Sequence, residues 1–392
     1  MGILSDIRVL DFGRYIAGPF CATLLGDLGA EVIRVEKRGG GEDRFLSPVA
    51  PDGTGATLLN LARNKAGMTL DPRTEGGSEV LRRLVATADV IVANLPRAGL
   101  ERMGLDYPTV SAAKPDIILT TVDAYGDTGP YADRVGFDGV GQAMSGNAHL
   151  TGPPGHPTRA YVPWVDFGTA SLAAFATVAA LWHRDRTGEG QHVQAALLRT
   201  ALQFNSFTLT EEAAIGKGRV STHNRGQTSG PTDLFRASDG WLVLQVVGNP
   251  IFERVARLVG REDWLSDPRF STDDGRGEHG AELSEVIARW VGERTRGQAI
   301  GEFNDAGVPS APVYDAAAAL ADPHVVATDM LVPTTYPGIG EVQVVAPPVS
   351  LSATPPAAPR PAPALGADTD EVLASLGYDD AAIARLRSDG AV

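Results

Sequence analysis

The chain has 392 residues, too many for one ordinary hydrophobic core, so we expect two domains or one large elaborated domain. Hydrophobic residues make up 43% of the chain and charged residues 21%, which is typical of a soluble globular protein and excludes general disorder. The net charge of −14 disfavours nucleic acid and anionic membranes as partners, and the single cysteine, Cys21, excludes an internal disulfide and a multi-thiolate metal site.

The negative charge is unevenly spread along the chain. Residues 1–104 hold 13 basic and 13 acidic side chains, so the whole net charge lies beyond residue 104, and the first quarter has room for a local basic site. The opening MGILSDIRVLDFG lacks the basic-then-apolar order of a signal peptide, and the most apolar stretch, residues 171–182, is too short to span a bilayer. We therefore expect a soluble, cytoplasmic protein without a membrane partner.

The first 126 residues alternate between strand and helix patterns. Strands are predicted at 7–13, 31–37, 67–71, 88–95 and 116–126, and helices at 18–30, 75–88 and around 100–103. Apolar strands separated by helices indicate right-handed βαβ units, and therefore a parallel sheet in a doubly wound, Rossmann-like α/β domain. Because ligands of such sheets lie at the carboxyl ends of the strands, the turns after residues 13, 37 and 95 form the candidate binding region.

The remainder of the chain predicts more of the large domain and then a smaller α+β domain. A long helix at 166–186, a strand at 191–197 and helical residues at 198–215 come first; after a turn-rich break, a strand at 239–247 and helices near 282–294 and 296–306 follow. The segment ATPPAAPRPAP at 353–363 predicts an extended strap. The tail returns to helix, where Asp368 and Glu371 have capping-box spacing and Gly377 is a predicted stop.

Common catalytic motifs give little support to several enzyme classes. GRGEHG at 275–280 matches the letters of a dinucleotide fingerprint, but it follows a polar run rather than a strand. The P-loop, the GxSxG nucleophile elbow and HExxH are absent, and the seven histidines show no metal-ligand spacing. Nicotinamide, serine-nucleophile and zinc chemistries therefore lack sequence support, and we expect neither a metal nor a tightly bound cofactor.

Basic side chains gather at the ends of the predicted strands. A surface arginine or lysine is most often only a solvated charge. Grouped at successive strand ends of one sheet, however, such side chains can hold phosphates through charge-assisted hydrogen bonds. The residues concerned are Arg34, Lys37, Arg38, Arg63, Lys65, Arg97 and Arg102.

Asp166 stands before the long apolar helix and has two interpretations. A carboxylate at this position commonly serves as an N-cap, satisfying backbone N–H groups of the first turn. The same helix terminus also favours an ionised carboxylate and offers N–H donors to a developing oxyanion, so Asp166 is also a candidate nucleophile toward an activated acyl group.

Longer segments show a family resemblance. The opening LDFGRYIAGPFCATLLGDLGAEVIRVEKRGGGEDR resembles the start of the CaiB/BaiF, or family III, CoA-transferases, which include formyl-CoA transferases. The resemblance continues in order through nearly the whole chain, in NLARNKAGMTLD, ADVIVANLPRAGLERMGLDY, YGDTGPYADRVGFD, DFGTASLAAFATVAALWHRDRTGEGQHV and ALGADTDEVLASLG.

The resemblance implies an architecture and an assembly. It implies a large Rossmann-like CoA-binding domain at 1–220 with a C-terminal return at 335–392, a small domain at 225–330, and linkers around 200–225 and 330–365. Family members form interlocked dimers of ring-shaped chains, so a homodimer is expected here.

The resemblance also implies a mechanism. Asp166 corresponds to the family's catalytic aspartate, which attacks an acyl-CoA thioester to give a mixed anhydride and then an aspartyl-CoA thioester. A free carboxylic acid finally accepts CoA. Because anhydrides hydrolyse, a lid is expected; it would fall near GQTSG at 226–230, which lacks the consecutive glycines of the formyl-CoA transferases. The implied CoA-contacting residues are Ala17, Arg38, Arg63, Asn64, Lys65, Asn94, Leu95, Arg102 and Met103.

Two other functions stay open at this level. The related 2-methylacyl-CoA racemases need two acid/base groups, and their histidine position is occupied here by Phe137, which cannot carry a proton. His149 lies twelve residues further on and is a possible substitute. A non-catalytic CoA-binding protein would be favoured if Asp166 were only a cap.

Overall fold

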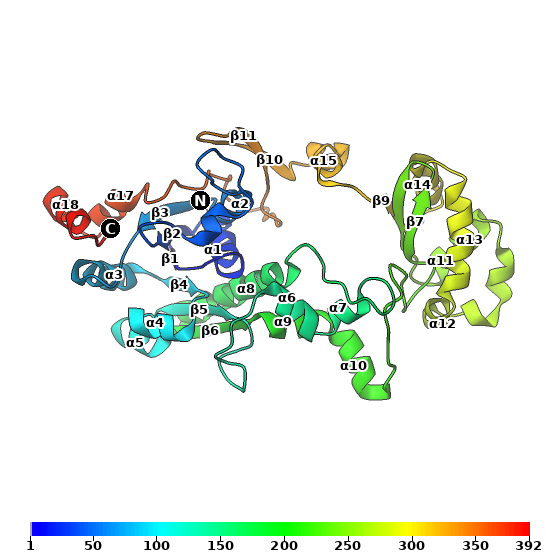
Figure 1. The fold of residues 1–392 in the computed structure, drawn as a ribbon, viewed down its shortest axis with the longest axis horizontal. Coiled ribbons are helices and arrows are strands. Elements are labelled where there is room, and N and C mark those ends of the chain that lie inside the picture. Colours follow the sequence, from blue (N-terminus) through cyan, green and yellow to red (C-terminus); the bar gives the residue numbers. More distant parts are fainter. Residues whose placement is uncertain (1) are drawn as a thin grey trace. The chain divides into compact units, whose positions relative to one another are not determined.

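The computed structural model describes residues 2–392, and the chain divides into two compact units (Figure 1). The first unit extends to Ser145 and also contains Tyr161–Leu209 and Pro323–Val392. The second unit contains Gly146–Ala160 and Thr210–Asp322. Each unit buries its own set of apolar side chains, as an independent domain does.

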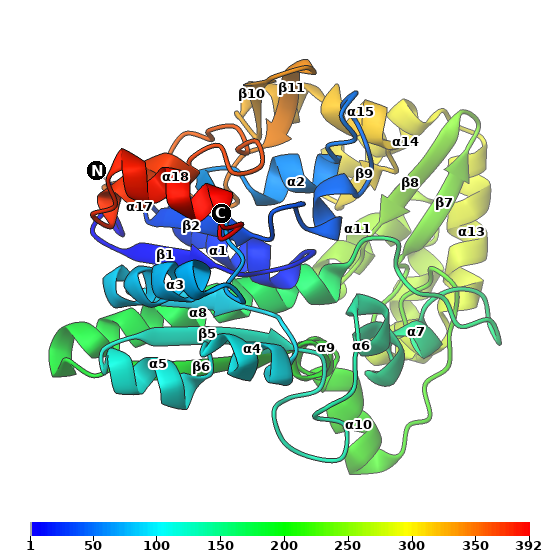
Figure 2. The ribbon, with the colours of Figure 1, turned by 60° about the vertical axis from the view of Figure 1, so that its left-hand side comes forward.

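A six-stranded parallel sheet forms the centre of the first unit (Figure 2). The strands lie in the order β3-β2-β1-β4-β5-β6, and every neighbouring pair is parallel. This is the doubly wound, Rossmann-like order, so the prediction of a large α/β domain with a parallel sheet is confirmed. The strands are β1 (Arg8–Asp11), β2 (Glu31–Glu36), β3 (Lys65–Thr69), β4 (Val90–Ala93), β5 (Ile118–Asp123) and β6 (Gln191–Ala196).

The direction of the sheet reverses between β1 and β4. From β1 the chain continues outward to β2 and β3, and it later returns to β4 on the other side of β1. The loops that follow β1 and β4 therefore diverge from neighbouring strand ends. In open α/β sheets this switch point is where ligands bind, which makes these two loops the structural counterpart of the predicted binding region.

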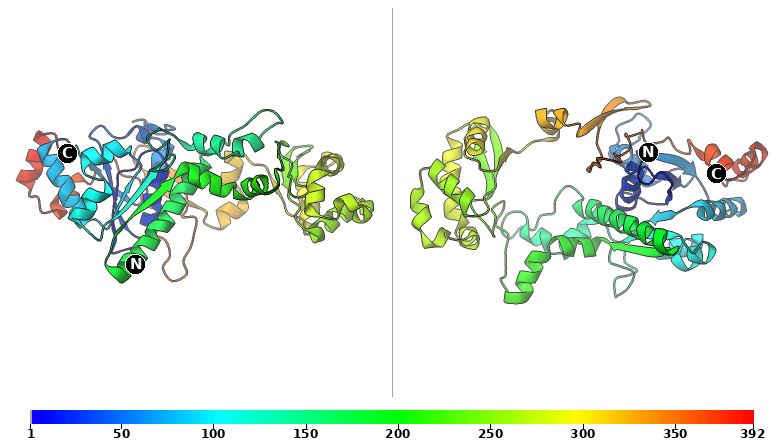
Figure 3. Two further views of the ribbon diagram at one scale, coloured as in Figure 1. Left: turned by 90° about the horizontal axis from the view of Figure 1, so that it is seen from below. Right: turned by 180° about the vertical axis from the view of Figure 1, so that it is seen from behind.

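Helices cover both faces of the sheet, because successive strand residues point to opposite sides (Figures 2 and 3). Val9 packs in a core with residues of α1 and α8, whereas Leu10 packs in the opposite core with residues of α3, α17 and α18. The helices of this unit's two faces are α1 (Ala17–Asp27), α8 (Trp164–Thr187), α9 (Leu197–Phe204), α3 (Glu75–Thr87), α4 (Arg97–Met103), α5 (Tyr107–Ala113), α17 (Thr369–Ser375) and α18 (Asp380–Ser388).

Shorter elements complete the first unit. A hairpin of β10 (Leu331–Tyr336) and β11 (Gly340–Val345) buries Tyr336 and Val344 against Leu59. The other short elements are the 3-10 helix Glu42–Phe45, α2 (Ala56–Leu61), α6 (Asp138–Met144) and α16 (Pro323–Ala327), and α10 (Ser206–Ile215) runs across the boundary between the units.

The longest helix, α8, belongs to the core of the first unit. By length and composition alone its 24 residues would suffice to cross a membrane. Val165, Ala170 and Ala173 are nevertheless buried in the core shared with α1 and the sheet, and core helices of soluble domains commonly have such composition.

The C-terminal segment returns to the first unit and binds along β3. Residues 353–363 form neither helix nor strand, in agreement with the predicted extended strap, and the Arg360 N–H donates to Asn64 Oδ1 over 2.7 Å. The predicted capping box is wrong, because Asp368 makes no cap bond to α17 and instead accepts from the Gly67 N–H over 2.7 Å. Gly377 follows α17 with a φ of +86°, so the predicted stop is confirmed.

The second unit is a small antiparallel sheet packed with helices. Its strands, β7 (Asp233–Ala237), β8 (Gly240–Leu244) and β9 (Ser310–Pro312), lie in that order, and only β8 had been predicted from the sequence. Phe235, Leu242, Phe252, Trp264 and Phe303 are buried together in its core. The helices are α7 (Asn147–Leu150), α11 (Asn249–Leu258), α12 (Asp273–Glu278), α13 (Gly280–Gly292), α14 (Arg296–Asp305) and α15 (Ala316–Leu320), with 3-10 turns at Glu262–Ser266 and Pro268–Phe270.

Candidate active site

Asp166 lies in the first turn of α8, not at its cap. The helix begins at Trp164, its N-cap position is Pro163, and no side chain of that position caps the helix. Asp166 is therefore the third helical residue, and the interpretation of this carboxylate as an N-cap is wrong.

The carboxylate that satisfies the start of α8 is Asp138, the first residue of α6. Its Oδ2 accepts from the Val165 N–H over 2.8 Å and from the Asp166 N–H over 3.2 Å, while Gln142 Nε2 donates to its Oδ1. Asp138 thus caps the start of α8, the role that the sequence suggested for Asp166. The Asp166 carboxylate is therefore not used as a helix cap. Asp138 was missed in the sequence analysis, although it directly follows Phe137, which occupies the histidine position of the racemases.

Burial makes Asp166 an unusual carboxyl group. Loss of water around it, together with the nearby negative charge of Asp138, raises the pKa of Asp166 to about 7. A place in the first turn of a helix favours the charged form, but the two nearest N–H groups already serve Asp138, so burial prevails. A carboxylate held with little hydration is a stronger nucleophile than a solvated one.

Close packing fixes the first turn of α8. A Cβ at Gly168 would lie 2.5 Å from the ring of Phe204, and one at Gly141 would lie 2.8 Å from Val165 Cγ1. The Trp164 and Phe204 rings stack with centroids 5.8 Å apart, so α8 and α9 lock this turn in one position. Rigid support of this kind is what a positioned nucleophile requires.

The loop after β1 reaches the neighbourhood of Asp138. Tyr15, in the left-handed region with a φ of +58°, packs edge-on against Phe137 with ring centroids 5.5 Å apart. Asn94, which follows β4, holds the same loop through two hydrogen bonds. Its Oδ1 accepts from the Arg14 N–H over 2.7 Å, and its Nδ2 donates to the Arg14 carbonyl over 2.8 Å. The loop after β1 therefore connects the switch point of the sheet, through Phe137 and Asp138, with the start of α8.

The structure brings some of the predicted CoA-contacting residues to this switch point. Ala17 is the first residue of α1, and Asn94 and Leu95 follow β4. Arg102 and Met103 form the end of α4, the next helix along the chain, with Arg102 exposed. Arg38 is exposed after β2 and lines a pocket of about 260 Å3 with Thr69, Leu365, Gly366, Thr369, Arg387 and Val392, on the side of the C-terminal helices.

Three further predicted contacts are buried and already engaged. Lys65 Nζ is completely buried, 2.7 Å from Asp11 Oδ2 and 2.7 Å from the Pro19 carbonyl. Burial opposes ionisation of Asp11, but the charges of Lys65 and Arg34 outweigh it and hold the pKa of Asp11 below its usual value. Arg63 and Asn64 both donate to Asp27, and Asn64 also accepts from the C-terminal strap. A contact of these three with CoA stays a prediction, and in this structure they hold the fold together.

The predicted lid segment and His149 both lie in the second unit. In the segment 226–230, the Gly226 N–H donates to the Thr232 carbonyl over 2.7 Å, and a Cβ at Gly230 would lie 2.7 Å from the Arg276 carbonyl oxygen. His149 is an exposed residue of α7. Their roles as lid and proton carrier stay predictions. Among residues 2–392, no three His, Cys, Asp or Glu side chains are grouped so as to hold a metal ion.

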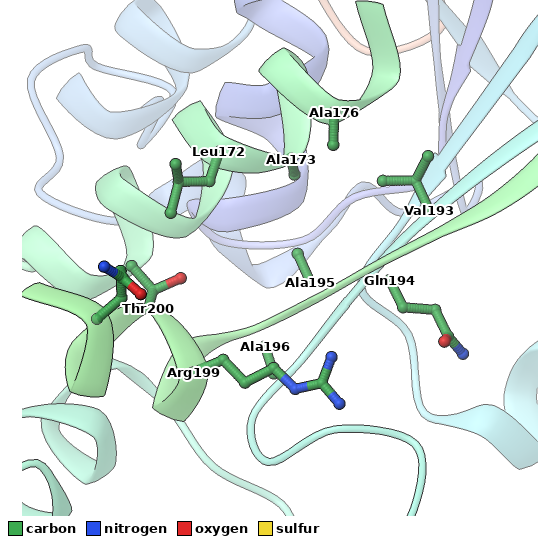
Figure 4. Close-up of a pocket in the computed structure, with 10 residues that line it drawn as sticks. Leu172, Ala173, Ala176, Val193, Gln194, Ala195, Ala196, Arg199 and Thr200 are labelled. Carbon is green, nitrogen blue, oxygen red and sulfur yellow. The ribbon is translucent and has the colours of Figure 1, made fainter. Parts of the chain in front are cut away.

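A separate hollow of about 290 Å3 lies between α8, β6 and α9 (Figure 4). It is lined mostly by aliphatic side chains, and Asp166 is not among its lining residues. Leu172, which lines it, and Phe175 and Trp182 of the same helix are exposed. This apolar surface is a second feature that calls for a partner, distinct from the chemistry around Asp166.

Comparison with known proteins agrees with this geometry. The sequence pattern described as "CoA-transferase family III" matches residues 4–369. The chain is 36% identical to a succinyl-CoA–D-citramalate CoA-transferase of Chloroflexus aurantiacus, covering 98% of this chain and 97% of that protein. It is 33% identical to a succinate–glutarate CoA-transferase of Agrobacterium fabrum, covering 95% of each. The crystal structure of a CaiB/BaiF family protein from Brucella suis superposes with a TM-score of 0.84 at 31% identity, covering 96% of this chain and 99% of that one.

Proposed function

The chain belongs to the family III CoA-transferases, and we propose that it moves CoA from an acyl-CoA thioester to a free carboxylic acid through covalent intermediates on Asp166. The observation that carries the proposal is the state of Asp166. It is a half-buried, weakly hydrated carboxylate in a rigid helical turn, relieved of capping by Asp138.

The proposed chemistry starts with attack of the Asp166 carboxylate on the thioester carbonyl carbon. The C–S bond breaks, CoA leaves as a thiolate, and a mixed anhydride joins Asp166 to the acyl group. The thiolate then attacks the Asp166 carbonyl, which releases the donor acid and forms an aspartyl-CoA thioester. These two steps keep the energy of the thioester on the enzyme instead of losing it to water.

The second half runs in reverse with a different acid. The acceptor carboxylate attacks the aspartyl thioester, giving a second anhydride and CoA thiolate. The thiolate attacks the acceptor carbonyl, so acceptor-CoA leaves and the Asp166 carboxylate is restored. No proton or electron is consumed, and Asp166 must be ionised at the start of each cycle.

We propose a dicarboxylic acid as the donor, in the form of a thioester such as succinyl-CoA. The two relatives compared above are named for succinate or succinyl-CoA together with citramalate or glutarate. Their identity with this chain extends over nearly all of it, which supports the same class of donor and an acceptor that is also a small carboxylic acid.

We propose that CoA lies across the switch point of the sheet. Ala17, Asn94 and Leu95 would contact it there, and Arg102, Met103 and Arg38 would reach its outer parts. Arg63, Asn64 and Lys65 would act by holding β3, α1 and the strap in place beneath it. CoA would enter and leave as substrate and product, without a tightly bound cofactor.

A cytoplasmic homodimer is the proposed working form, with the 226–230 segment as a lid. The exposed Leu172, Phe175 and Trp182 of α8 support a second copy as the occupant of that surface. Light scattering should find dimers for the natural protein and monomers for Phe175→Glu, and a monomeric natural protein would reject the assembly.

The direct test is chemical capture of the intermediate. Incubation with succinyl-CoA and hydroxylamine should convert Asp166 alone to its hydroxamate, detected by peptide mass spectrometry. The contrasting outcome is racemase behaviour: in deuterated water, rapid deuteration at the α-carbon of a 2-methylacyl-CoA without any acceptor acid would replace this proposal. With Phe137 in the position weighed for a histidine, we expect no such exchange.

A further inference from the structure

Arg14 is a charged side chain at the switch point without a partner. Its Nη1 is buried and donates to no neighbour, and among residues 2–392 its guanidinium takes part in no ion pair or hydrogen bond. Arg34 and Arg276 also contain a buried unbonded nitrogen, but each of them has another guanidinium nitrogen that donates to an acid or a carbonyl. A buried guanidinium N–H group without an acceptor is costly, so the buried Nη1 of the half-buried Arg14 calls for a ligand.

The carboxylates around Arg14 are already taken by other cations. Asp11 pairs with Lys65 at 2.7 Å and Asp43 with Arg34 at 2.7 Å. Glu36 holds Arg44, and the exposed Glu42 holds Lys37. Arg14 is the base without an ion pair at the carboxyl ends of β1 and β2, although its charge acts on Glu42 at longer range and Asp43 keeps its Oδ1 without a hydrogen bond.

Hydrogen bonds to its backbone fix Arg14 at the edge of the candidate binding region. Asn94 holds both the N–H and the carbonyl of Arg14, so the residue is fixed between the ends of β1 and β4. Nη1 lies beside Gly41, where a Cβ would be 3.6 Å away. The adjoining helix α1 begins three residues later with no side-chain cap and no acid in its first turn, so its positive end adds to the same field.

Resting on the function proposed above, we propose that Arg14 binds an oxyanion of the acyl-CoA donor. Guanidinium groups suit both phosphates and carboxylates, because their planar fork donates two parallel hydrogen bonds. The oxyanion is therefore either a phosphate of CoA or the free carboxylate at the far end of a dicarboxylic acyl group. Both are present on succinyl-CoA, and the two sources can be separated by shortened probes.

The experiment measures binding of CoA, which has phosphates and no acyl carboxylate, and of succinyl-pantetheine, which has the carboxylate and no phosphate. The variants are Arg14→Ala, Arg14→Lys and, as a matched control, Arg82→Ala, an exposed arginine of α3 paired with Glu79. If Arg14 binds a phosphate, Arg14→Ala weakens CoA binding about 10-fold to 100-fold and leaves succinyl-pantetheine unchanged. If it binds the acyl carboxylate, the pattern is reversed.

Either pattern supports the proposal, provided that Arg82→Ala binds both probes like the natural protein. Because the Arg14 side chain makes no bond within the fold, Arg14→Ala should melt at the natural temperature or above. Arg14→Lys should recover part of the lost affinity, since it keeps the charge but not the fork. Unchanged affinity of Arg14→Ala for both probes overturns the role of Arg14.

The test of Arg14 can fail independently of the test of CoA transfer. Capture of the Asp166 hydroxamate combined with natural binding by Arg14→Ala would reject Arg14 alone. Arg14-dependent CoA binding in a protein that forms no adduct would reject the transfer and keep the oxyanion site.

Discussion

Two groups of charged residues in the first unit differ in whether the fold pairs them with opposite charges. Around β1–β3, buried bases are paired with acids: Lys65 with Asp11, Arg34 with Asp43 and Glu36, and Arg63 with Asp27. In the first turn of α8, Asp166 is half-buried beside another acid, Asp138, and in the loop after β1, Arg14 forms no ion pair. Matched charges stabilise one arrangement of the chain, whereas the unmatched ones remain available for a substrate.

The largest expected effect is on turnover and comes from Asp166→Asn. Removing the nucleophile should abolish CoA transfer by at least about a thousandfold, because the covalent route has no substitute group. The chain should still fold, since the amide is the same size and Asp138 keeps capping α8. Asp185→Asn, an exposed acid of the same helix, is the matched control and should transfer CoA normally. Turnover in Asp166→Asn at the natural rate would refute the assignment.

Among the paired charges, Lys65→Met removes the buried ion pair with Asp11, and we expect it to lower the stability of the fold. The change leaves the buried Asp11 without its ion-pair partner, which should cost about 3–5 kcal/mol of unfolding free energy. Lys37→Met removes the exposed pair with Glu42 and should cost less than about 1 kcal/mol. Denaturant unfolding of both variants measures the difference, and the double variant Asp11→Asn with Lys65→Met should recover part of the loss. Equal losses for the two lysines would show that burial does not distinguish these pairs.

The unmatched group should show a stability cost that depends on pH. Because the pKa of Asp166 is raised from 3.8 to about 7 in the folded chain, folding disfavours its charged form. That penalty is absent below about pH 4, grows as the pH rises toward 7 and is fully present above it. Asp166→Asn lacks the penalty, so at pH 8 it should be more stable than the natural protein by roughly 2–4 kcal/mol, and at pH 4 equally stable. Melting curves at both pH values measure this, and a stabilisation confined to pH 4 would reverse the argument.

The smallest effect concerns the coupling between Asp138 and Asp166. Since Asp166 must be ionised to attack, kcat/KM should rise with pH through about 7. Asp138→Asn keeps an oxygen to accept from the Val165 N–H but removes a negative charge, so the pKa of Asp166 should fall and the rise should move to lower pH. The readout is the midpoint of the pH–rate profile. A midpoint that stays in place would show that burial alone raises the pKa of Asp166.

Much of the fold could be predicted from the sequence, because it follows from local patterns. Apolar strands such as 88–95 and 116–126 appear as β4 and β5, and the alternation with helices predicts the parallel sheet. The long helix near Asp166 also follows from local pattern, but its start two residues earlier, at Trp164, was not predicted.

What could not be predicted depends on contacts between distant residues. Asp138 caps a helix 27 residues away, and Lys65 meets an acid 54 residues before it. In the sequence, Lys65, Arg38 and Arg102 are similar basic residues near predicted strands and helices. Only the fold shows that Lys65 is buried in an ion pair with Asp11. Arg14 was overlooked for the same reason, since its importance lies in the partners that it lacks.

Because the C-terminal segment packs against the sheet, the first unit cannot be completed until the end of the chain has been synthesised. The Asp71 N–H donates to the Ala391 carbonyl over 2.7 Å, and Ile383, Leu386 and Ala391 fill the core on one face of the sheet. At roughly 5–20 residues per second, β3 leaves the ribosome well before residues 369–392 exist, by a delay of about 15–60 seconds. During that interval the outer face of β3 lacks its cover, and its apolar side chains are exposed to other nascent chains. A cell that makes this enzyme therefore has to shelter an unfinished sheet until the final helices are synthesised.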